Sequence, residues 1–363
     1  MSELTDGSSS GAPAENVRRW LRRWLPRFFL VVGFALLVYA VSRYPLAEIV
    51  RACRRFGPWV ALTPLVALGW VCCNASALYL LLDKRVPWRQ VLRIRLVGDG
   101  YNALLPLAGM GGEPYRVKHL AAFVPMEQAV TGVIRDRILN NASGMFFTSL
   151  WLALAVGHFA LGGSLRFAVI AYAGIAPVVG LAIMLLVLST LPGRAAGVLA
   201  RWLGARSQSV VTLPPAKLAR VFAWYLAARA IGPLEFALLL WLLGLGFDPI
   251  TILFCYSLHH PAGTVGFVFP GGVGLHEGVS VYLFSLLGFP GPAGVAFALA
   301  RRGRMLVVGF LGVALHLWGL RSARRQADAE PLRPHRPVEA KDGVGASPRT
   351  AEAPATAGVE KVA

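Results

Sequence analysis

Residues 99–120 have the sequence DGYNALLPLAGMGGEPYRVKHL, and the spacing that begins in this stretch occurs twice in the chain. Pro106 is followed by Glu113 seven positions later and by Arg137 twenty-four positions after that. Several glycines surround the proline, and apolar residues lie on both sides. Because proline removes a backbone donor and ends or kinks a helix, the pattern predicts a helix that breaks inside apolar surroundings and then resumes.

The second copy begins in FVFPGGVGLHEGV at 267–279, which contains Pro270 and Glu277, and Arg301 follows Glu277 by twenty-four positions, so the three residue types recur at the same spacings. Each of them follows its first-copy counterpart by 164 positions. Broken membrane helices often form binding sites, and charges inside a membrane are costly unless they meet a ligand, a partner charge or water. A solute or lipid pathway is therefore the leading functional hypothesis.

The composition favours a protein embedded in a membrane. Of the 363 residues, 56% are hydrophobic and only 15% are charged, and the mean hydropathy is +0.59. This apolar content exceeds what a soluble domain of this length would bury. The formal net charge of +18 comes from short basic runs between apolar stretches, which indicates membrane topology rather than nucleic-acid binding. We expect no nucleic-acid partner.

Six apolar stretches are candidate crossings, because a helix needs about 20 residues to span the hydrocarbon core. Two further apolar stretches, 98–122 and 250–288, are interrupted by glycine and proline and are predicted to be re-entrant hairpins. Residues 1–16 and 321–363 are polar and are predicted to be disordered tails. The six candidate crossings are 26–42, 58–82, 138–157, 168–191, 221–245 and 305–320.

The predicted fold is an all-α, polytopic membrane helical bundle. Residues 17–320 form its transmembrane domain, with one repeat at about 20–160 and a second at about 165–320. Three crossings in each repeat would invert the second relative to the first, and inverted repeats are an architecture of transporters. The alternative to a repeat is that the match arose by chance. Chance would then have to produce three matched residue types at matched spacings.

Basic segments set the predicted orientation. The flank 18–27, the loops 84–95 and 194–220 and the flank 321–325 are arginine- and lysine-rich, so all four, and both termini, are expected in the cytoplasm. The basic segment 43–55 falls outside under this scheme unless an interfacial helix holds it. The first apolar stretch is interpreted as a retained signal anchor, with a cleaved signal peptide as the alternative.

The runs GDGYNALLPLAGMGGEPYRVKHL, PGGVGLHEGVSVYLFSLLGF and ALARRGRM resemble the signatures of a flippase-like membrane family that includes the transmembrane region of lysylphosphatidylglycerol synthases. The resemblance covers about residues 20–320, and NALLPLAGMGGE is similar to the branch associated with hopanoid lipid synthesis. It implies lipid translocation or handling at the bacterial inner membrane. Residues 322–363 are too few and too polar for the soluble aminoacyl-transfer domain of the synthases, so lipid aminoacylation is not expected.

Several charged and polar residues are candidates for binding a substrate. Glu113 and Arg116 lie one helical turn apart and either neutralise one another or leave Arg116 and Arg137 to hold an anionic headgroup through the planar guanidinium fork. Glu277 is interpreted either as a carrier of a coupling proton or as half of a structural ion pair. The full candidate set is Asn102, Glu113, Arg116, Arg137, Glu277, Arg301 and Arg304.

The residues at the two predicted breaks are prolines and glycines, which permit close approach of the backbone. No metal site is expected, because the neighbouring His259 and His260 have no acid or thiol at ligand spacing, and the four cysteines lack the spacing of a zinc site. No cofactor and no catalytic residue are assigned. The break residues are Pro106, Gly111, Gly112, Pro270, Gly272 and Gly274.

A lipid transporter is the preferred function, and a membrane-embedded enzyme or an accessory scaffold of lipid biosynthesis is the alternative. A prenyl- or phosphoryl-transfer enzyme would be expected to carry an aspartate-rich magnesium cluster, and an ATP-driven pump a phosphate-binding loop. The sequence has neither motif. A membrane lipid is the expected ligand, lipid-biosynthesis enzymes are candidate partners, and the sequence sets no oligomeric state.

Overall fold

A computed structural model describes residues 41–104, 111–159, 162–188, 213–246, 248–265 and 274–329, together with a few positions between 28 and 39. Every regular element in these ranges is a helix, so this part of the chain is all-α, as the sequence predicts. The helices up to Gly319 belong to one compact unit. The elements are α2 (Leu46–Arg55), η1 (Gly57–Ala61), α3 (Leu62–Leu81), α4 (Trp88–Leu104), α5 (Glu113–Leu120), α6 (Met126–His158), α7 (Gly163–Leu188), α9 (Pro215–Leu242), α10 (Pro249–Val265), α11 (Leu275–Leu286) and α12 (Gly291–Ala329).

Five helical segments within the described residues are long and apolar enough to cross a membrane, which confirms a multi-pass membrane bundle. Each contains one of the predicted crossings or most of it, whereas the predicted crossing at 26–42 lies largely outside the described residues. The five segments are Gly57–Leu81, Met126–His158, Gly163–Ala182, Pro215–Leu242 and Gly291–Ser322.

Two of these helices begin well before the predicted crossings. The helix α6 begins at Met126 rather than at 138, and α12 begins at Gly291 rather than at 305. The third and fourth turns of these helices contain Asp136 and Arg137 in α6 and Arg301 and Arg304 in α12, which lower the local hydropathy, so an apolar window excludes them. These residues face the interior of the bundle, where they meet opposite charges. At its other end α12 continues to Ala329, into the segment predicted to be the C-terminal tail.

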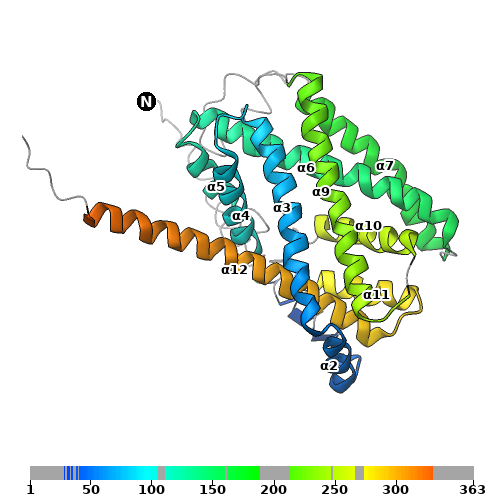
Figure 1. Ribbon diagram of the computed structural model, residues 1–363. Helices are drawn as coiled ribbons and strands as arrows, with labels where there is room; N and C mark the ends of the chain where they lie inside the picture. The colour runs from blue at the N-terminus through cyan, green and yellow to red at the C-terminus, as the bar shows by residue number, and fades with distance from the viewer. Residues whose placement is uncertain are drawn as a thin grey trace, which may run out of the picture. The chain divides into compact units, whose positions relative to one another are not determined.

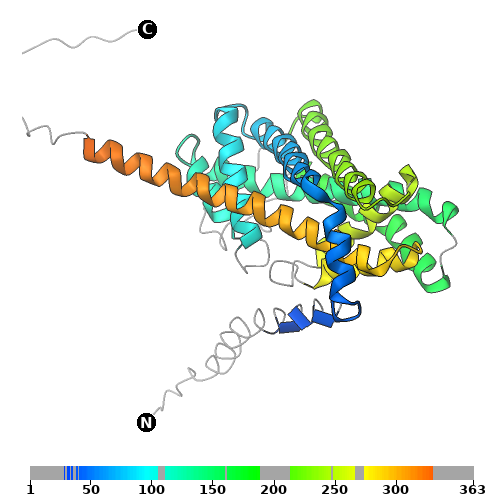
Figure 2. The same ribbon diagram turned by 60° about the horizontal axis from the view of Figure 1, so that its bottom comes forward.

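The helices α3 and α9 pack side by side, and both views show them adjacent along much of their length (Figures 1 and 2). A Cβ added at Gly69 of α3 would lie 3.6 Å from Cδ1 of Ile231 in α9, so the Ile231 side chain packs against α3 at this glycine. The helix α6 packs against both α7 and α10. Most of α7 carries apolar side chains on its exposed surface, such as Phe167, Ile175 and Val178, as expected of a helix that faces lipid.

Each predicted hairpin contains two helices that contact one another, α4 with α5 and α10 with α11. The helices α4 and α10 have 17 residues each, which is about 25 Å at 1.5 Å per residue. This length is less than the roughly 30 Å of the hydrocarbon core. The connecting residues 105–110 and 266–273, which include Pro106, Pro270 and Gly272, lie outside the described residues.

The basic segment at 43–55 contains α2, an amphipathic helix. Ile49 and Ala52 are buried, whereas Arg51 and Arg54 are exposed. This distribution of side chains is that of an interfacial helix. Such a helix was the condition under which the predicted orientation could accommodate the basic segment.

The last helix packs against α4 through glycines that bring the two backbones together. A Cβ added at Gly312 would meet the backbone oxygen of Leu96, and one added at Gly100 would lie 2.7 Å from the backbone oxygen of Gly309. Backbone atoms cannot rotate away as a side chain can. The crossing of α4 and α12 therefore depends on glycine.

We predict that Gly312→Ala lowers the free energy of unfolding by about 1 to 3 kcal/mol, the usual cost of overpacking. The matched control is Gly303→Ala on the same helix, where an added Cβ would meet nothing within 4 Å. The control should be neutral or stabilising, because alanine favours a helix more than glycine does. Thermal unfolding of the purified variants in one detergent measures the difference. Equal melting temperatures for the two variants would contradict the close crossing.

Candidate functional site

Six charged side chains meet where α4, α5 and α6 approach one another, and we name them the first charge cluster. Three are arginines and three are carboxylates, so their formal charges cancel. All six come from the segments that surround the first predicted break. The members are Arg95 and Asp99 of α4, Glu113 and Arg116 of α5, and Asp136 and Arg137 of α6.

The centre of the first charge cluster is the ion pair between Arg95 and Asp136. Nη1 of Arg95 donates to both carboxylate oxygens of Asp136 at 2.7 Å, and Nε donates to Asp99 at 3.3 Å. The hydroxyl of Tyr225, from α9, donates to Asp136 at 2.7 Å. Arg95 and Asp136 are 2% and 1% exposed. Burial costs each charge its hydration, so the partners must compensate for it.

Arg116 and Arg137 complete the first charge cluster. Arg116 donates to Asp99 and lies 3.7 Å from Glu113, so the predicted pair one helical turn apart exists, although Asp99 is the closer partner. Nη1 of Arg137 lies 2.5 Å from Oε1 of Glu113. The glutamate and arginine of the first repeated motif are therefore in direct contact.

Asn102 connects the two sides of the first break. Its side-chain oxygen accepts the backbone N–H of Gly112 at 2.7 Å, and its Nδ2 donates to Glu113 at 3.3 Å. A Cβ added at Gly112 would meet the backbone of Gly98, so the N-terminus of α5 touches the main chain of α4 within its C-terminal half. Gly111 lies in the turn that precedes α5.

A second group of charges lies among α9, α11 and α12, and we name it the second charge cluster. Nε of Arg304 is 3.0 Å from Oε1 of Glu235, and Nε of Arg301 is 3.9 Å from the same oxygen. Arg302 lies 3.6 Å from Glu277. Three arginines therefore surround two carboxylates, which leaves this cluster with one excess positive charge among the described residues.

The polar atoms of the second charge cluster are incompletely hydrogen-bonded. The Nε atoms of Arg301 and Arg304 and Oε1 of Glu235 are buried and make no hydrogen bond within the described part of the chain. Nε of Arg304 is close to Oε1 of Glu235, but the two groups are not aligned for a hydrogen bond. Arg301 instead lies over the ring of Phe236, 4.6 Å from its centre, in a cation–π contact. Unsatisfied buried donors are costly in a native protein, and a polar ligand is one way to satisfy them.

Glu277 has a local structural partner as well as Arg302. Its Oε2 accepts the backbone N–H of Gly274 at 2.8 Å, at the first turn of α11. Gly274 has φ of +83°, which favours glycine because other residues clash in this left-handed region. The glycine at the second break thus sets the direction in which α11 begins.

A cavity of about 80 Å³ lies beside the second charge cluster. Ser280 contributes to its wall, and His259 lies behind it: Nε2 of His259 is 2.9 Å from the Ser280 hydroxyl, and its Nδ1 is 2.8 Å from the carbonyl of Cys255. A carbonyl accepts only, so Nδ1 of His259 carries the proton. The Ser280 hydroxyl donates to the carbonyl of His276 at 2.8 Å, and Nε2 of His259 is a second acceptor for the same proton. The cavity is lined by His276, Glu277, Ser280, Ala298, Arg301, Arg302, Arg304 and Met305.

The structure thus divides the candidate residues between two places. Asn102, Glu113, Arg116 and Arg137 belong to the first charge cluster or contact it. Glu277, Arg301 and Arg304 belong to the second, but Glu277 pairs with Arg302 and not with Arg301. No group of three side chains suitable for a metal ion occurs among the described residues.

Several charged residues outside the candidate set hold these clusters together. They are Arg95, Asp99, Asp136, Glu235 and Arg302. Charges within the helices of a membrane bundle are a signal in the sequence. Arg95 and Asp99 pair within α4, but the other partners lie on different helices. Arg229 is a further example, since it donates to the backbone and side-chain oxygens of Asn140 at 2.8 and 2.7 Å.

We predict that Asp136→Asn lowers the free energy of unfolding by about 3 to 5 kcal/mol, because it leaves the buried Arg95 without its main counter-charge. The matched control is Asp83→Asn. Asp83 pairs with Lys217 at 2.6 Å, but 54% of its side chain is exposed, so its loss should cost about 0 to 1 kcal/mol. Melting temperatures in detergent test this contrast, which fails if the two variants are equally stable.

Comparison with known proteins places the fold in a family. No curated protein matches the chain. The family described as the lysylphosphatidylglycerol synthase TM region matches residues 28–312. The match includes both charge clusters and all the helices from α2 to α11. The chain therefore belongs to the family of the lysylphosphatidylglycerol synthase transmembrane region.

Proposed function

We propose that this protein is a flippase-like lipid transporter that binds a polar or anionic lipid headgroup at the second charge cluster. The observation that carries the proposal is the excess positive charge of this cluster beside a cavity. Arg301, Arg302 and Arg304 outnumber Glu235 and Glu277. A phosphate would neutralise the excess and accept hydrogen bonds from guanidinium groups.

The first charge cluster has no such excess, so it supports a different role. Its three arginines are matched by three carboxylates, and Arg116 is 3% exposed. We assign Arg116, Arg137 and Glu113 to holding the first break in shape. The two copies of the motif then serve different purposes, one structural and one for the ligand.

We further propose that the two halves are inverted repeats. Under the 164-residue offset α3 corresponds to α9, α4 to α10 and α6 to α12. Gly144 of α6 approaches His260 of α10, and the corresponding residues, Val308 of α12 and Leu96 of α4, share one buried cluster. The contact between α3 and α9 joins corresponding helices, as a two-fold axis through their crossing requires.

The family supports a location in the bacterial inner membrane, and the basic flanks support cytoplasmic termini. A membrane-embedded enzyme, or an accessory protein of lipid biosynthesis such as that of hopanoids, is the second candidate. The pairing of the Ser280 hydroxyl with His259 in the cavity wall favours an enzyme, since such a pair is the start of nucleophilic chemistry. Ser280→Ala separates the two functions, because it removes the nucleophile and leaves the arginines in place.

We predict that Arg301→Lys slows lipid translocation at least tenfold in proteoliposomes. Lysine keeps the charge but lacks the planar group that contacts two phosphate oxygens. The measurement is the accessibility of fluorescent phosphatidylglycerol to an external reductant. Arg54→Ala, which changes an exposed arginine of α2, is the control and should translocate normally. Normal rates for both Arg301→Lys and Arg301→Ala would refute the headgroup site.

The inverted repeat predicts that the two breaks are reached from opposite sides of the membrane. Single cysteines at Gly109 and Gly272, in a chain whose four native cysteines are replaced by alanine, should react with an impermeant maleimide from opposite faces. Right-side-out and inside-out vesicles provide the two measurements. Labelling of both positions from one face only would exclude the inverted arrangement.

A further inference from the structure

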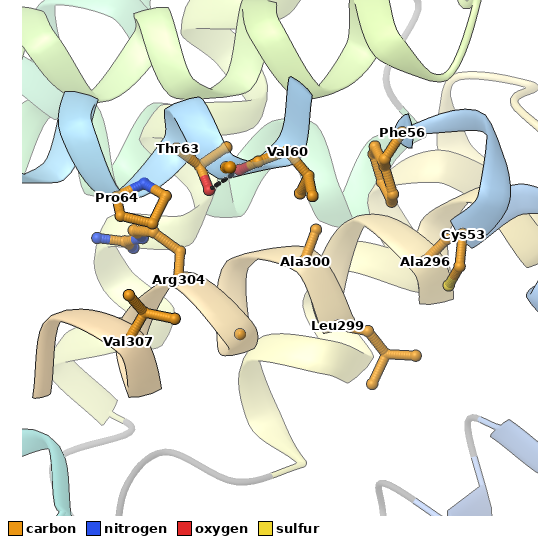
Figure 3. Close-up of a pocket in the computed structure, with 12 residues that line it drawn as sticks. Cys53, Phe56, Val60, Thr63, Pro64, Ala296, Leu299, Ala300, Arg304 and Val307 are labelled. Atoms are coloured by element: carbon orange, nitrogen blue, oxygen red, sulfur yellow. Dashed lines mark hydrogen bonds between the residues drawn. The ribbon is translucent and has the colours of Figure 1, made fainter. Parts of the chain in front are cut away.

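A second cavity, of about 410 Å³, lies between α12 and the segment that connects α2 to α3. This volume is typical of ligand pockets, which are about 300 to 1,000 Å³. Figure 3 shows the two walls: Phe56, Val60 and Pro64 project from one side, and Ala300 and Val307 from α12 on the other. We name this cavity the α12 groove.

The mouth of the α12 groove is surrounded by exposed apolar side chains. Leu299 and Val307 of α12 line the groove and are 38% and 53% exposed. Leu62 and Leu65, which flank the lining residues Thr63 and Pro64 in the sequence, are 38% and 61% exposed. Both sides of the groove belong to candidate membrane spans, Gly57–Leu81 and Gly291–Ser322. Apolar residues that face outward in a spanning helix face hydrocarbon, so the groove opens toward lipid chains.

One residue of the lining carries a charge, and that residue is Arg304. In Figure 3 its guanidinium lies near Pro64, at the end of the groove away from Cys53. Arg304 also lines the smaller cavity of the second charge cluster. The apolar groove therefore ends at the cluster that has one excess positive charge.

This arrangement is complementary to an anionic phospholipid. An acyl chain matches the apolar walls, and a phosphodiester carries the single negative charge that balances the cluster. A zwitterionic phospholipid would bring its own cation to a site that already contains three arginines, and a free phosphate would leave the groove empty. The shape and the charge thus select the same ligand.

We propose that the α12 groove holds one acyl chain of an anionic phospholipid, whose phosphodiester is bound by Arg304. The inference rests on the proposed function only in taking a lipid as the ligand. It concerns binding at equilibrium, which is measured without transport.

Gly303 provides a way to fill the groove without disturbing the fold. It is exposed, it lines the groove, and a Cβ added there would meet nothing within 4 Å. Gly174 of α7 is the matched control, because it is also an exposed glycine in a membrane span with nothing within 4 Å of an added Cβ. Gly303→Leu and Gly174→Leu therefore add the same side chain inside and outside the groove.

The test is native mass spectrometry of the purified full chain, titrated in detergent with phosphatidylglycerol or with phosphatidylcholine. The unmodified chain should retain one phosphatidylglycerol at least tenfold more tightly than phosphatidylcholine. Gly303→Leu should weaken phosphatidylglycerol binding at least tenfold, whereas Gly174→Leu should not change it. Arg304→Gln should reduce the affinity for phosphatidylglycerol to that for phosphatidylcholine.

Cys53 gives a second measurement in the unmodified chain, so the result does not depend on any variant folding. It is a free, half-buried cysteine in the wall of the groove. Because burial raises the pKa of its thiol, alkylation is carried out at alkaline pH. Phosphatidylglycerol should protect Cys53 but not Cys72, which lies on α3 outside the groove lining.

Undiminished phosphatidylglycerol binding by Gly303→Leu, or equal alkylation of Cys53 with and without phosphatidylglycerol, would overturn the groove assignment. Equal binding of the two lipids by the unmodified chain would overturn the role of Arg304. If the lipid binds as expected but no translocation occurs, the groove stands and the transporter function fails. If translocation occurs without Cys53 protection, the transporter stands and the groove fails.

Discussion

The buried ion pair between Arg95 and Asp136 is the constraint on which the first half of the structure depends. It joins α4 to α6, and Tyr225 extends it to α9. In a bilayer, no water is available to solvate either charge if the ion pair breaks. Separation of the helices would therefore leave two unsolvated ions. The pair makes one relative position of α4, α6 and α9 much more stable than any other.

A comparison of the two charge clusters shows how repeated sequence can lead to unequal chemistry. In the first cluster every arginine has a carboxylate, and Asn102 ties the break to the same network. In the second, Arg301 and Arg304 share Glu235, so arginines outnumber carboxylates. Both clusters contain buried Nε atoms without a hydrogen bond, such as that of Arg116 in the first, so the difference between them is one of charge. A balanced network stabilises a fold, whereas an unbalanced one is costly in the absence of a ligand. This cost is the reason to expect binding in the second half.

The sequence predicted the helical class and the pair of Glu113 with Arg116, because hydropathy and helical spacing are local properties. It assigned Arg137 to a headgroup and did not predict its contact with Glu113. It did not predict that Glu277 would pair with Arg302. Neighbouring residues on a helix point about 100° apart, and the relative rotation of α11 and α12 selects one of them. Gly274 sets where α11 begins, but the sequence alone does not give that rotation. The partners of Asp136 and Glu235 depend likewise on packing between helices.

The contact of α12 with α4 has a consequence for the order in which the protein assembles. The glycine-lined face of α4 is covered by α12, which is synthesised after every other helix in the described part of the chain. During translation, α4 therefore enters the membrane long before its partner exists, and Gly100 and Leu96 face lipid or another protein until α12 arrives. The first hairpin can reach its final packing only after release of nearly the whole chain from the ribosome. An insertase or chaperone that shields α4 in that interval would bind a surface that α12 buries in the folded protein.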